Sequence, residues 1–462
     1  MLFHTPSFAV FFAAYFLLHV ALPPAHRLWL VVAGGSLFYG YWQPLHVWLP
    51  LGLTLIACLG AAVVAAQADP AARRRWLAVT VVLLLLPLAV FKYTGFLLSD
   101  VMGLASAGIE APVIALPLGI SFVTFTLIAY AVDVARRDFP PGGKPVLLGA
   151  NVLFFPHLVA GPILRPGQVI PQLARPRAWR GAPWTLAGLI FTSGVIKKVW
   201  LADQLAPVVD RIIVQPQPSA AEAWLCLYAF AGQIYGDFSG YTDMAIGLAL
   251  ALGVRLPSNF RRPYAATSVA LFWRRWHITL SEWLRDYLYI PLGGNRGGRL
   301  RRLRNVVLTM GLGGLWHGAA WTFVAWGLLH AGGILLAHFW GAARRHLGLP
   351  ALPSPLAILL CFHFVAVCWI FFRAPDFASA ARLLAALVGN GSDALDVAGA
   401  NLLPLTVLAV FFATHRYDGH ARLRLLARRL PAALLWPPML AIVGFGMLAQ
   451  LGGAQQFIYF EF

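Results

Sequence analysis

The sequence predicts an all-α protein that crosses a membrane many times. Of its 462 residues, 60% are hydrophobic and only 11% are charged, and the mean hydropathy is +0.73. Soluble domains carry about 25% charged residues, so this chain lacks the polar surface that water requires. Its long apolar stretches show none of the alternation of a barrel strand. Because lipid cannot satisfy backbone hydrogen bonds, such stretches must form helices.

Apolar segments of about 20 residues can span a bilayer, and counting them predicts roughly ten to twelve transmembrane helices. The expected spans are 1–24, 45–68, 111–132, 184–201, 223–252, 306–340 in two pieces, 351–372, 402–414 and 432–451, with further spans between them. The first has neither a basic start nor a cleavage pattern, so we expect it to be retained.

Two segments differ from plain spans. Residues 146–164 lie between basic loops and contain Pro156, Gly161 and Pro162, which favours a re-entrant hairpin. Between residues 255 and 304, Trp, Tyr and Arg interleave, as is typical of helices lying at the headgroup boundary. We expect one membrane domain, 1–462, with a core of about 116–340 flanked by spans at 1–110 and 351–462.

The net charge of +18 is carried by loops. Basic residues fill alternate loops, among them Arg73 to Arg75, then Arg136, Arg137 and Lys144. By the positive-inside rule, these loops are cytoplasmic and the N-terminus is extracytoplasmic. The expected contacts of the arginines are therefore anionic membrane lipids, not nucleic acid. The four cysteines have no paired or metal-ligand spacing, so we expect no metal site.

His317 is the first candidate for chemistry. It lies in GLGGLWHGAAW, next to Trp316, inside a stretch from Asn305 to Trp340 that has no Asp, Glu, Lys or Arg. An ionisable side chain inside a membrane segment indicates a functional site, and burial favours the neutral imidazole, which can accept a proton. The alternative is a core histidine bonded to a carbonyl, which composition alone makes equally plausible.

His277 is the second candidate, in FWRRWHITLSEWLRDYLYIPLGGNR. Aromatic and basic side chains around it could hold an anionic ligand such as a coenzyme A ester, and the alternative is an interfacial aromatic belt with snorkelling arginines. The supporting candidates in this segment are Trp276, Arg274, Arg275, Arg285 and Asn295.

Asp237 and Asp243 complete the candidates. Six residues apart, they do not share a face of an ideal helix. We expect them to orient His or Arg partners instead of acting as an acid–base couple. Walker A, GxSxG and HExxH motifs are missing, so ATPase, hydrolase and metalloprotease readings lose support.

These motifs resemble the membrane-bound O-acyltransferase (MBOAT) family, in the bacterial branch that includes the membrane subunits of alginate O-acetyltransferases. The resemblance extends over nearly the whole chain. Its motifs are LPLGISFVTFTLIAYAVDV at 116–134, FFPHLVAGPILRPGQVIPQL at 154–173, DFSGYTDMAIGLALALGVRLPSNFRRPY at 237–264, the two histidine motifs, and termini reading MLFHTPSF and QFIYFEF.

The resemblance implies a ring of tilted helices around a thin centre, with His317 as the catalytic histidine and His277 as a second functional position. It implies acetyl-coenzyme A or a related acyl thioester as the cytoplasmic donor, with no bound cofactor, and location in a bacterial inner membrane. It also implies an exported polysaccharide as the acceptor, reached directly or through a periplasmic SGNH-type partner. The polymer stays open between alginate, cellulose and another glycan, because SFVTFT at 121–126 differs from the alginate-type wording.

Two other functions remain open at this point. A glycan or lipid transporter or flippase would use buried His and Asp as a proton relay, and would show inverted repeats, which the sequence does not show. A stand-alone lipid or protein acyltransferase would have the same fold and differ only in its acceptor.

Overall fold

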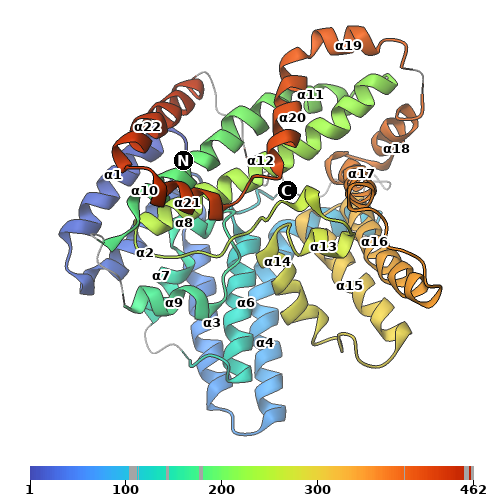
Figure 1. Cartoon of the computed structure of the whole chain (residues 1–462). Helices are drawn as coiled ribbons and strands as arrows, with labels where there is room; N and C mark the ends of the chain where they lie inside the picture. Colours follow the sequence, from blue (N-terminus) through green and yellow to red (C-terminus); the bar gives the residue numbers. More distant parts are fainter. Residues whose placement is uncertain are drawn as a thin grey trace. The chain divides into compact units, whose positions relative to one another are not determined.

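The structure, a computed structural model, describes residues 1–103, 112, 114–141, 145–175, 181–389, 391–451, 457 and 458. Helices connected by turns and loops make up these ranges, and none of them contains a strand (Figure 1). The predicted all-α fold is therefore confirmed. Lys144 and most of the terminal segment 456–462 lie outside the described residues.

Six helices in the described part of the chain are long and apolar enough to cross a membrane. They cover Pro44–Ala66, Pro70–Val101, Trp184–Ile213, Trp321–His346, Ser354–Arg373 and Ala432–Ala449. A seventh is counted if α19 (Ala394–Ala400) and α20 (Leu402–His415), which meet at an angle of 88°, form one broken span.

This number is lower than the ten to twelve spans expected, for physical reasons that individual helices show. The first expected span yields α1 (Pro6–Ala21), and α6 (Ile120–Arg136) is similarly short. At about 1.5 Å per residue, their 16 and 17 residues are shorter than the hydrocarbon core of a bilayer. The segment expected to form a re-entrant hairpin folds into α7 (Pro145–Val152) and α8 (Phe155–Leu158), and neither can cross the bilayer alone.

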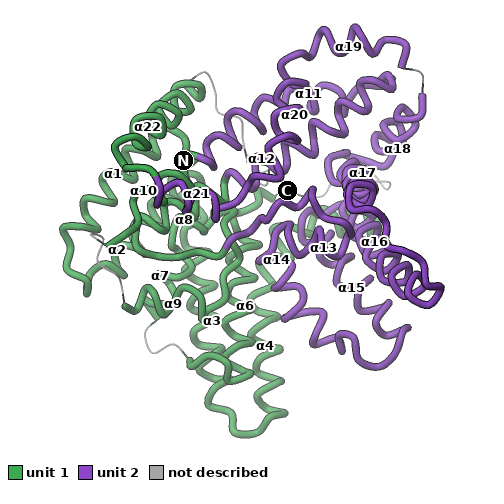
Figure 2. The backbone as a smooth tube through the Cα atoms, viewed as in Figure 1, with its two compact units in different colours: residues 1–192, 241–257, 430–454 green, residues 193–240, 258–429, 455–462 purple. Residues whose placement is uncertain are grey.

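The chain forms two compact units (Figure 2). Unit 1 comprises residues 1–192, 241–257 and 430–454, and unit 2 comprises 193–240, 258–429 and 455–462. Helix α12 (Ala220–Ala251) contributes its first two thirds to unit 2 and its last residues to unit 1. The sequence predicts a single domain, 1–462, and gives no sign of this division, so the single domain stays a prediction.

Unit 1 packs its helices around phenylalanine rings. Phe155 is fully buried, and its ring contacts those of Phe11 and Tyr15 at 5.3 and 5.1 Å. A Cβ on Gly35 would lie 1.8 Å from the carbonyl oxygen of Leu153, so only glycine allows this approach. The other α-helices of unit 1 are α2 (Pro24–Gly40), α3 (Trp48–Ala66), α4 (Pro70–Leu88), α5 (Thr94–Phe96), α9 (Pro166–Ala174), α10 (Trp184–Val195, whose last three residues belong to unit 2) and α22 (Ala432–Ala449).

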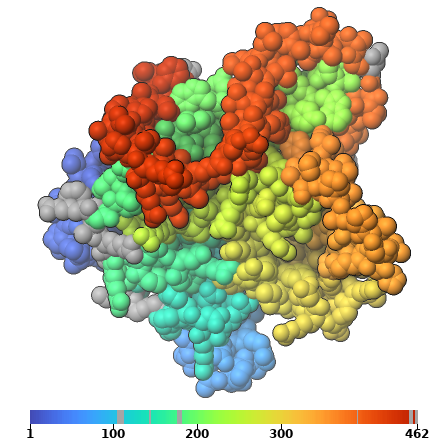
Figure 3. All heavy atoms as spheres, viewed as in Figure 1, coloured from blue at the N-terminus to red at the C-terminus, as the bar shows by residue number. Residues whose placement is uncertain are grey.

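Unit 2 holds both histidine motifs. Three of its long helices, α15 (Arg299–His317), α16 (Trp321–His346) and α17 (Ser354–Arg373), pack in sequence, α15 on α16 and α16 on α17, yellow through orange in Figure 3. The remaining helices are α11 (Asp203–Ile213), α13 (Val269–Trp273), α14 (Ile278–Trp283), α18 (Phe377–Ala386) and α21 (His420–Arg429), with π-helical segments η6 (Ile196–Ala202) and η8 (Leu284–Tyr289).

Side-chain caps fix where several helices begin. Asp69 accepts hydrogen bonds from the backbone N–H groups of Ala71 and Ala72 at the start of α4. The hydroxyl of Ser268 accepts one from Leu271 N at the start of α13. Such caps satisfy N–H groups that have no partner within the helix. Helix α13, which Ser268 caps, leads directly to His277.

Candidate functional site

His317 is the last residue of α15, at a break in the long apolar stretch. The chain is extended at Gly318 and Ala320, and α16 begins at Trp321. The two expected pieces of this stretch thus meet directly after the candidate histidine. A Cβ on Gly318 would lie 2.0 Å from the ring of Phe323, so a larger residue would push this turn apart. The break places an imidazole at a helix end, and its side chain is only 4% exposed.

Aromatic rings surround His317. Its ring centroid lies 4.9 Å from that of Trp316, 5.0 Å from that of Trp326 and 5.3 Å from that of Phe372. All three contacts are edge-on, a preferred geometry for aromatic pairs. They come from α15, α16 and α17, so three helices together exclude solvent from this imidazole.

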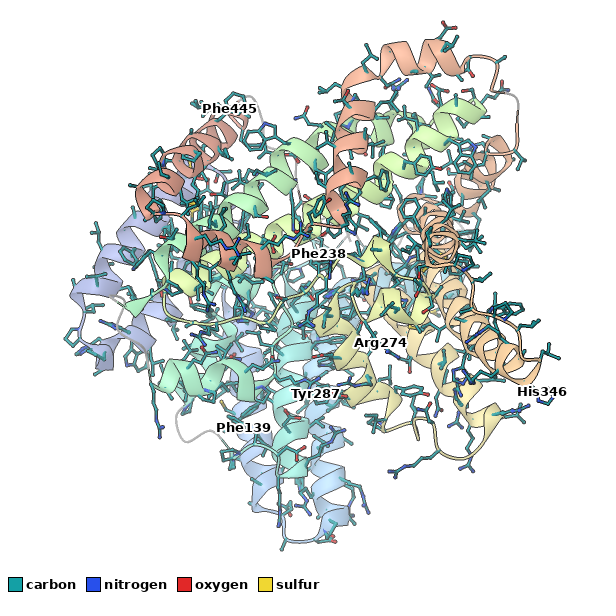
Figure 4. The ribbon with its side chains drawn as sticks, in the orientation of Figure 1. Phe139, Phe238, Arg274, Tyr287, His346 and Phe445 are labelled. Carbon is teal, nitrogen blue, oxygen red and sulfur yellow. The ribbon has the colours of Figure 1, made fainter. Side chains whose placement is uncertain are left out.

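His277 is held in an unusual backbone conformation. It precedes α14 with φ 41° and ψ 55°, in the left-handed region that few residues other than glycine adopt. Its side chain is completely buried, and its ring meets that of Phe238 edge-on at 4.6 Å. Phe238, on α12, is labelled in Figure 4. Burial lowers the pKa of His277 to about 3, so its imidazole is neutral near pH 7.

Backbone and side-chain hydrogen bonds tie His277 to a preceding segment of the same unit. Ile278 N donates to the carbonyl oxygen of Asn259 at 2.9 Å, and Arg261 N donates to that of Arg275 at 2.9 Å. The Nδ1 atom of His277 lies 3.3 Å from Oδ1 of Asn259, which itself is buried. Asn259 was not predicted as a site residue from the sequence, because an asparagine in a loop ordinarily indicates a turn.

The two candidate histidines meet in unit 2. Their ring centroids are 6.3 Å apart, and the ring of Trp316 lies 6.2 Å from that of His277. Side chains from α12, from α15 and from the residue that precedes α14 therefore converge on one water-poor site containing two imidazoles. Neutral imidazole accepts protons from hydroxyl groups and can act as a general base.

The supporting candidates of the second histidine motif lie in different surroundings. Trp276 is fully buried and contacts the rings of Trp369 at 4.9 Å and Phe260 at 5.0 Å, as a core residue does. Arg275 is half-buried and donates to the carbonyl oxygen of Ala265. Arg274 is exposed on the turn after α13, where Figure 4 labels it.

Arg285 and Asn295 are also exposed. Arg285 forms an ion pair with Asp286 at 2.6 Å, and Oδ1 of Asn295 accepts from the hydroxyl of Tyr289 at 2.7 Å. Arg285 contributes to the wall of a partly open cavity of about 140 Å³, together with Trp273, Ser281, Leu284, Tyr289, Val306, Thr309, Met310 and Ile334. Neither candidate histidine lines it. The roles of these residues in donor binding stay predictions.

Asp237 belongs to a buried ion network that the sequence analysis did not identify. Its Oδ1 lies 2.7 Å from Nζ of Lys198, and Oδ2 accepts from Ile458 N at 2.7 Å. Lys198 also pairs with Asp203 at 2.8 Å. The partner of Asp237 is thus a lysine, where a histidine or arginine was expected. Asp243 is buried as well, but belongs to unit 1.

A lysine within an apolar helix was the signal for this network. Lys198 lies in the span Trp184–Ile213, and a charged residue there requires buried partners. The described residues contain no group of three His, Cys, Asp or Glu side chains placed to hold a metal ion.

Comparison with known proteins identifies the family. The sequence model described as "MBOAT, membrane-bound O-acyltransferase family" matches residues 150–373, a range that contains both histidines. The probable alginate O-acetylase AlgI of Azotobacter vinelandii is 40% identical over 423 residues, which are 89% of this chain and 83% of that protein. The chain belongs to the membrane-bound O-acyltransferase family. This multi-pass membrane protein is therefore an O-acyltransferase.

Two further relatives differ in the glycan that their names give. A peptidoglycan O-acetyltransferase of Helicobacter pylori is 36% identical over 85% of this O-acyltransferase and 80% of its own length. A teichoic acid D-alanyltransferase of Bacillus subtilis is 26% identical over 56% of this chain and 69% of its own. The three names give acyl transfer to alginate, peptidoglycan and teichoic acid, respectively.

Proposed function

We propose that this protein transfers acetyl from a cytoplasmic acyl thioester, such as acetyl-coenzyme A, to hydroxyl groups of an exported polysaccharide. The observation that carries the proposal is the meeting of two buried imidazoles, 6.3 Å apart, at the break between α15 and α16. The names of the relatives support an acetyl group and a glycan acceptor, alginate or peptidoglycan among them.

In the proposed reaction His317 is the general base. The acceptor hydroxyl oxygen attacks the thioester carbonyl carbon, and neutral His317 takes the hydroxyl proton. The new C–O bond forms, the C–S bond breaks, and His317 returns the proton to the departing thiolate. Proton transfer of this kind contributes about 10²- to 10⁴-fold to rate.

The aromatic rings around His317 exclude water, which limits hydrolysis of the thioester and strengthens the electrostatics of the site.

The surroundings of the enzyme are part of the proposal. It works in the bacterial inner membrane, with its N-terminus extracytoplasmic and its basic loops in the cytoplasm. Arg285 and its basic neighbours receive the anionic donor at the cytoplasmic mouth. The acceptor hydroxyl at His317 belongs either to the polymer itself or to an extracytoplasmic partner of the SGNH type that family resemblance implies, which then passes acetyl to the polymer.

The test compares polymer-bound acetate in wild type, a deletion strain, and His317→Ala at normal membrane level. The control is His338→Ala, which removes an exposed imidazole from α16. We expect acetate to vanish in the deletion and in His317→Ala while polymer export continues, and to remain in His338→Ala. Arrest of export in His317→Ala would indicate a transporter instead, and normal acetylation would remove His317 from the reaction.

A further inference from the structure

We propose that Asn259 is a positioning residue that fixes His277 with its proton on Nδ1 and its lone pair on Nε2. The inference rests on the proposed function only for its consequence in catalysis. Its geometric basis is a set of hydrogen bonds converging on one atom, Oδ1 of Asn259, within unit 2.

The identity of that atom is settled by a backbone donor. The two ends of an asparagine amide look alike in shape, so their assignment depends on hydrogen-bond partners. Thr279 N lies 3.1 Å from the Asn259 atom, and a backbone N–H can only donate. Its partner must therefore be the amide oxygen. The hydroxyl of Thr279, at 3.0 Å, donates to the same oxygen.

The proton position on His277 follows. Its Nδ1 lies 3.3 Å from this oxygen, which can only accept. Nδ1 must then carry the hydrogen, and in a neutral imidazole the other nitrogen, Nε2, holds the lone pair. A neutral His277 in this tautomer offers its site an acceptor at Nε2.

Backbone hydrogen bonds also hold Asn259 next to His277. Ile278 N donates to the main-chain oxygen of Asn259, so the main chain and side chain of Asn259 hold successive N–H groups at the start of α14. His277 itself lies in the left-handed region, with its Nδ1 atom within 3.3 Å of this amide oxygen. A side chain that orients a catalytic imidazole in this way determines which nitrogen can act.

Ring contacts bring one titratable side chain against His277 in the described part of the chain. Helix α12 contributes Phe238, and α15 contributes Trp316 and the titratable His317. Next to Phe238 in sequence, Asp237 is engaged with Lys198. On its own helix, Glu282 interacts electrostatically with Arg285.

The Asn259→Asp variant distinguishes two possible roles of Asn259, orienting the imidazole of His277 and only holding the start of α14. The carboxylate still accepts from Thr279 N and from Nδ1 of His277, so the start of α14 is kept. Its charge favours the imidazolium form and raises the pKa of His277. We expect the acid limb of the kcat profile to move up by at least about one pH unit, with KM changed less than about twofold. Asn259→Leu, which removes the acceptor, should lower kcat at least about tenfold.

The control repeats the same chemical change elsewhere. Asn401 is buried and accepts from Arg211 through Oδ1, so Asn401→Asp introduces a carboxylate into unit 2 without touching His277. The acid limb of the kcat profile of Asn401→Asp should match that of the wild type. An unshifted limb in Asn259→Asp, or a wild-type kcat in Asn259→Leu, would overturn the proposal.

A second readout does not depend on catalysis. The midpoint of thermal unfolding in nanodiscs is measured between pH 5 and pH 8 for wild type, Asn259→Asp, His277→Asn and the double variant. The unfolding midpoint is expected to drop between pH 8 and pH 5, and Asn259→Asp should make this drop smaller. The effect should be larger when His277 is present than in the His277→Asn background. Equal effects in both backgrounds would refute the pairing. If the wild type transfers no acetyl at all, the proposed function fails, while this measurement still decides the role of Asn259.

Discussion

The imidazole rings of His277 and His317 lie 6.3 Å apart, although 39 residues separate them in the sequence. One precedes a short helix in a left-handed conformation, and the other ends a long helix directly before a break. The site therefore depends both on the backbone conformation at these positions and on the imidazole rings, and substitutions of His277 can separate the two.

Replacements of His277 should differ in stability according to their backbone preference. Asparagine enters the left-handed region readily, whereas alanine there costs about 1–2 kcal/mol. We expect His277→Asn to unfold close to the wild-type temperature and His277→Ala to unfold at a clearly lower one. Acetyl transfer should fall in both. Thermal unfolding in detergent and an acetyl-transfer assay are the measurements, and identical midpoints for the two variants would contradict the prediction.

The buried ion network of Lys198, Asp203 and Asp237 should be costly to break. Lys198→Met leaves two carboxylates buried without their cation, for which we expect a loss of about 3–5 kcal/mol. Arg285→Gln is the control, because it removes one partner of the exposed pair with Asp286, which is worth about 0–1 kcal/mol. Denaturant or thermal unfolding checks the difference. Comparable losses in the two variants would show that the network contributes little.

The contact between α15 and α16 depends on glycine. A Cβ on Gly327 would lie 2.2 Å from the carbonyl oxygen of Met310, so Gly327→Ala must separate the helices, at a cost of about 1–3 kcal/mol. Gly332, on the same helix, has open space around it, so Gly332→Ala should be neutral or stabilising by about 0.5–1 kcal/mol. The folded yield and unfolding midpoint of both variants test this. A harmless Gly327→Ala would mean that the helices can move apart freely.

Folding stability should fall in acid, in part through His277. Its pKa is lowered to about 3 in the folded protein, against about 6.5 when unfolded, so the unfolded chain binds protons first as pH decreases. The contribution of neutral His277 to the free energy of unfolding is fully present above about pH 6.5 and is lost as the pH falls toward 3. At pH 5 the loss from this residue is about 2 kcal/mol. His277→Asn should show a shallower decline between pH 7.5 and pH 5. A decline as steep as in the wild type would show that other groups account for it.

The features that the lipid environment determines, such as helical secondary structure, could be predicted from the sequence. The all-α fold followed from apolar runs, and the division of 306–340 into two pieces is confirmed by the break between α15 and α16. The placement of His317 beside His277 needed tertiary contacts, because their motifs are joined by α14, η8 and a glycine-containing turn whose path periodicity does not specify.

Other features were beyond the sequence for physical reasons. Asn259 is recognisable only by its hydrogen bonds to Thr279 and His277, which join separate segments. The described residues contain fewer candidate spans than the sequence predicts, because helices such as α6 are shorter than the hydrocarbon core of a bilayer. Lys198 could have been found, since a lysine inside an apolar helix is itself a signal.

The left-handed backbone at position 277 limits how this position can evolve. A β-branched or bulky side chain would be strained there, while glycine, asparagine, aspartate and histidine are tolerated. Of these, only histidine and asparagine bring a neutral side chain that both donates and accepts hydrogen bonds. Substitutions that keep both the backbone conformation and this hydrogen-bonding capacity are therefore restricted to these two residues, whatever polymer a related enzyme modifies.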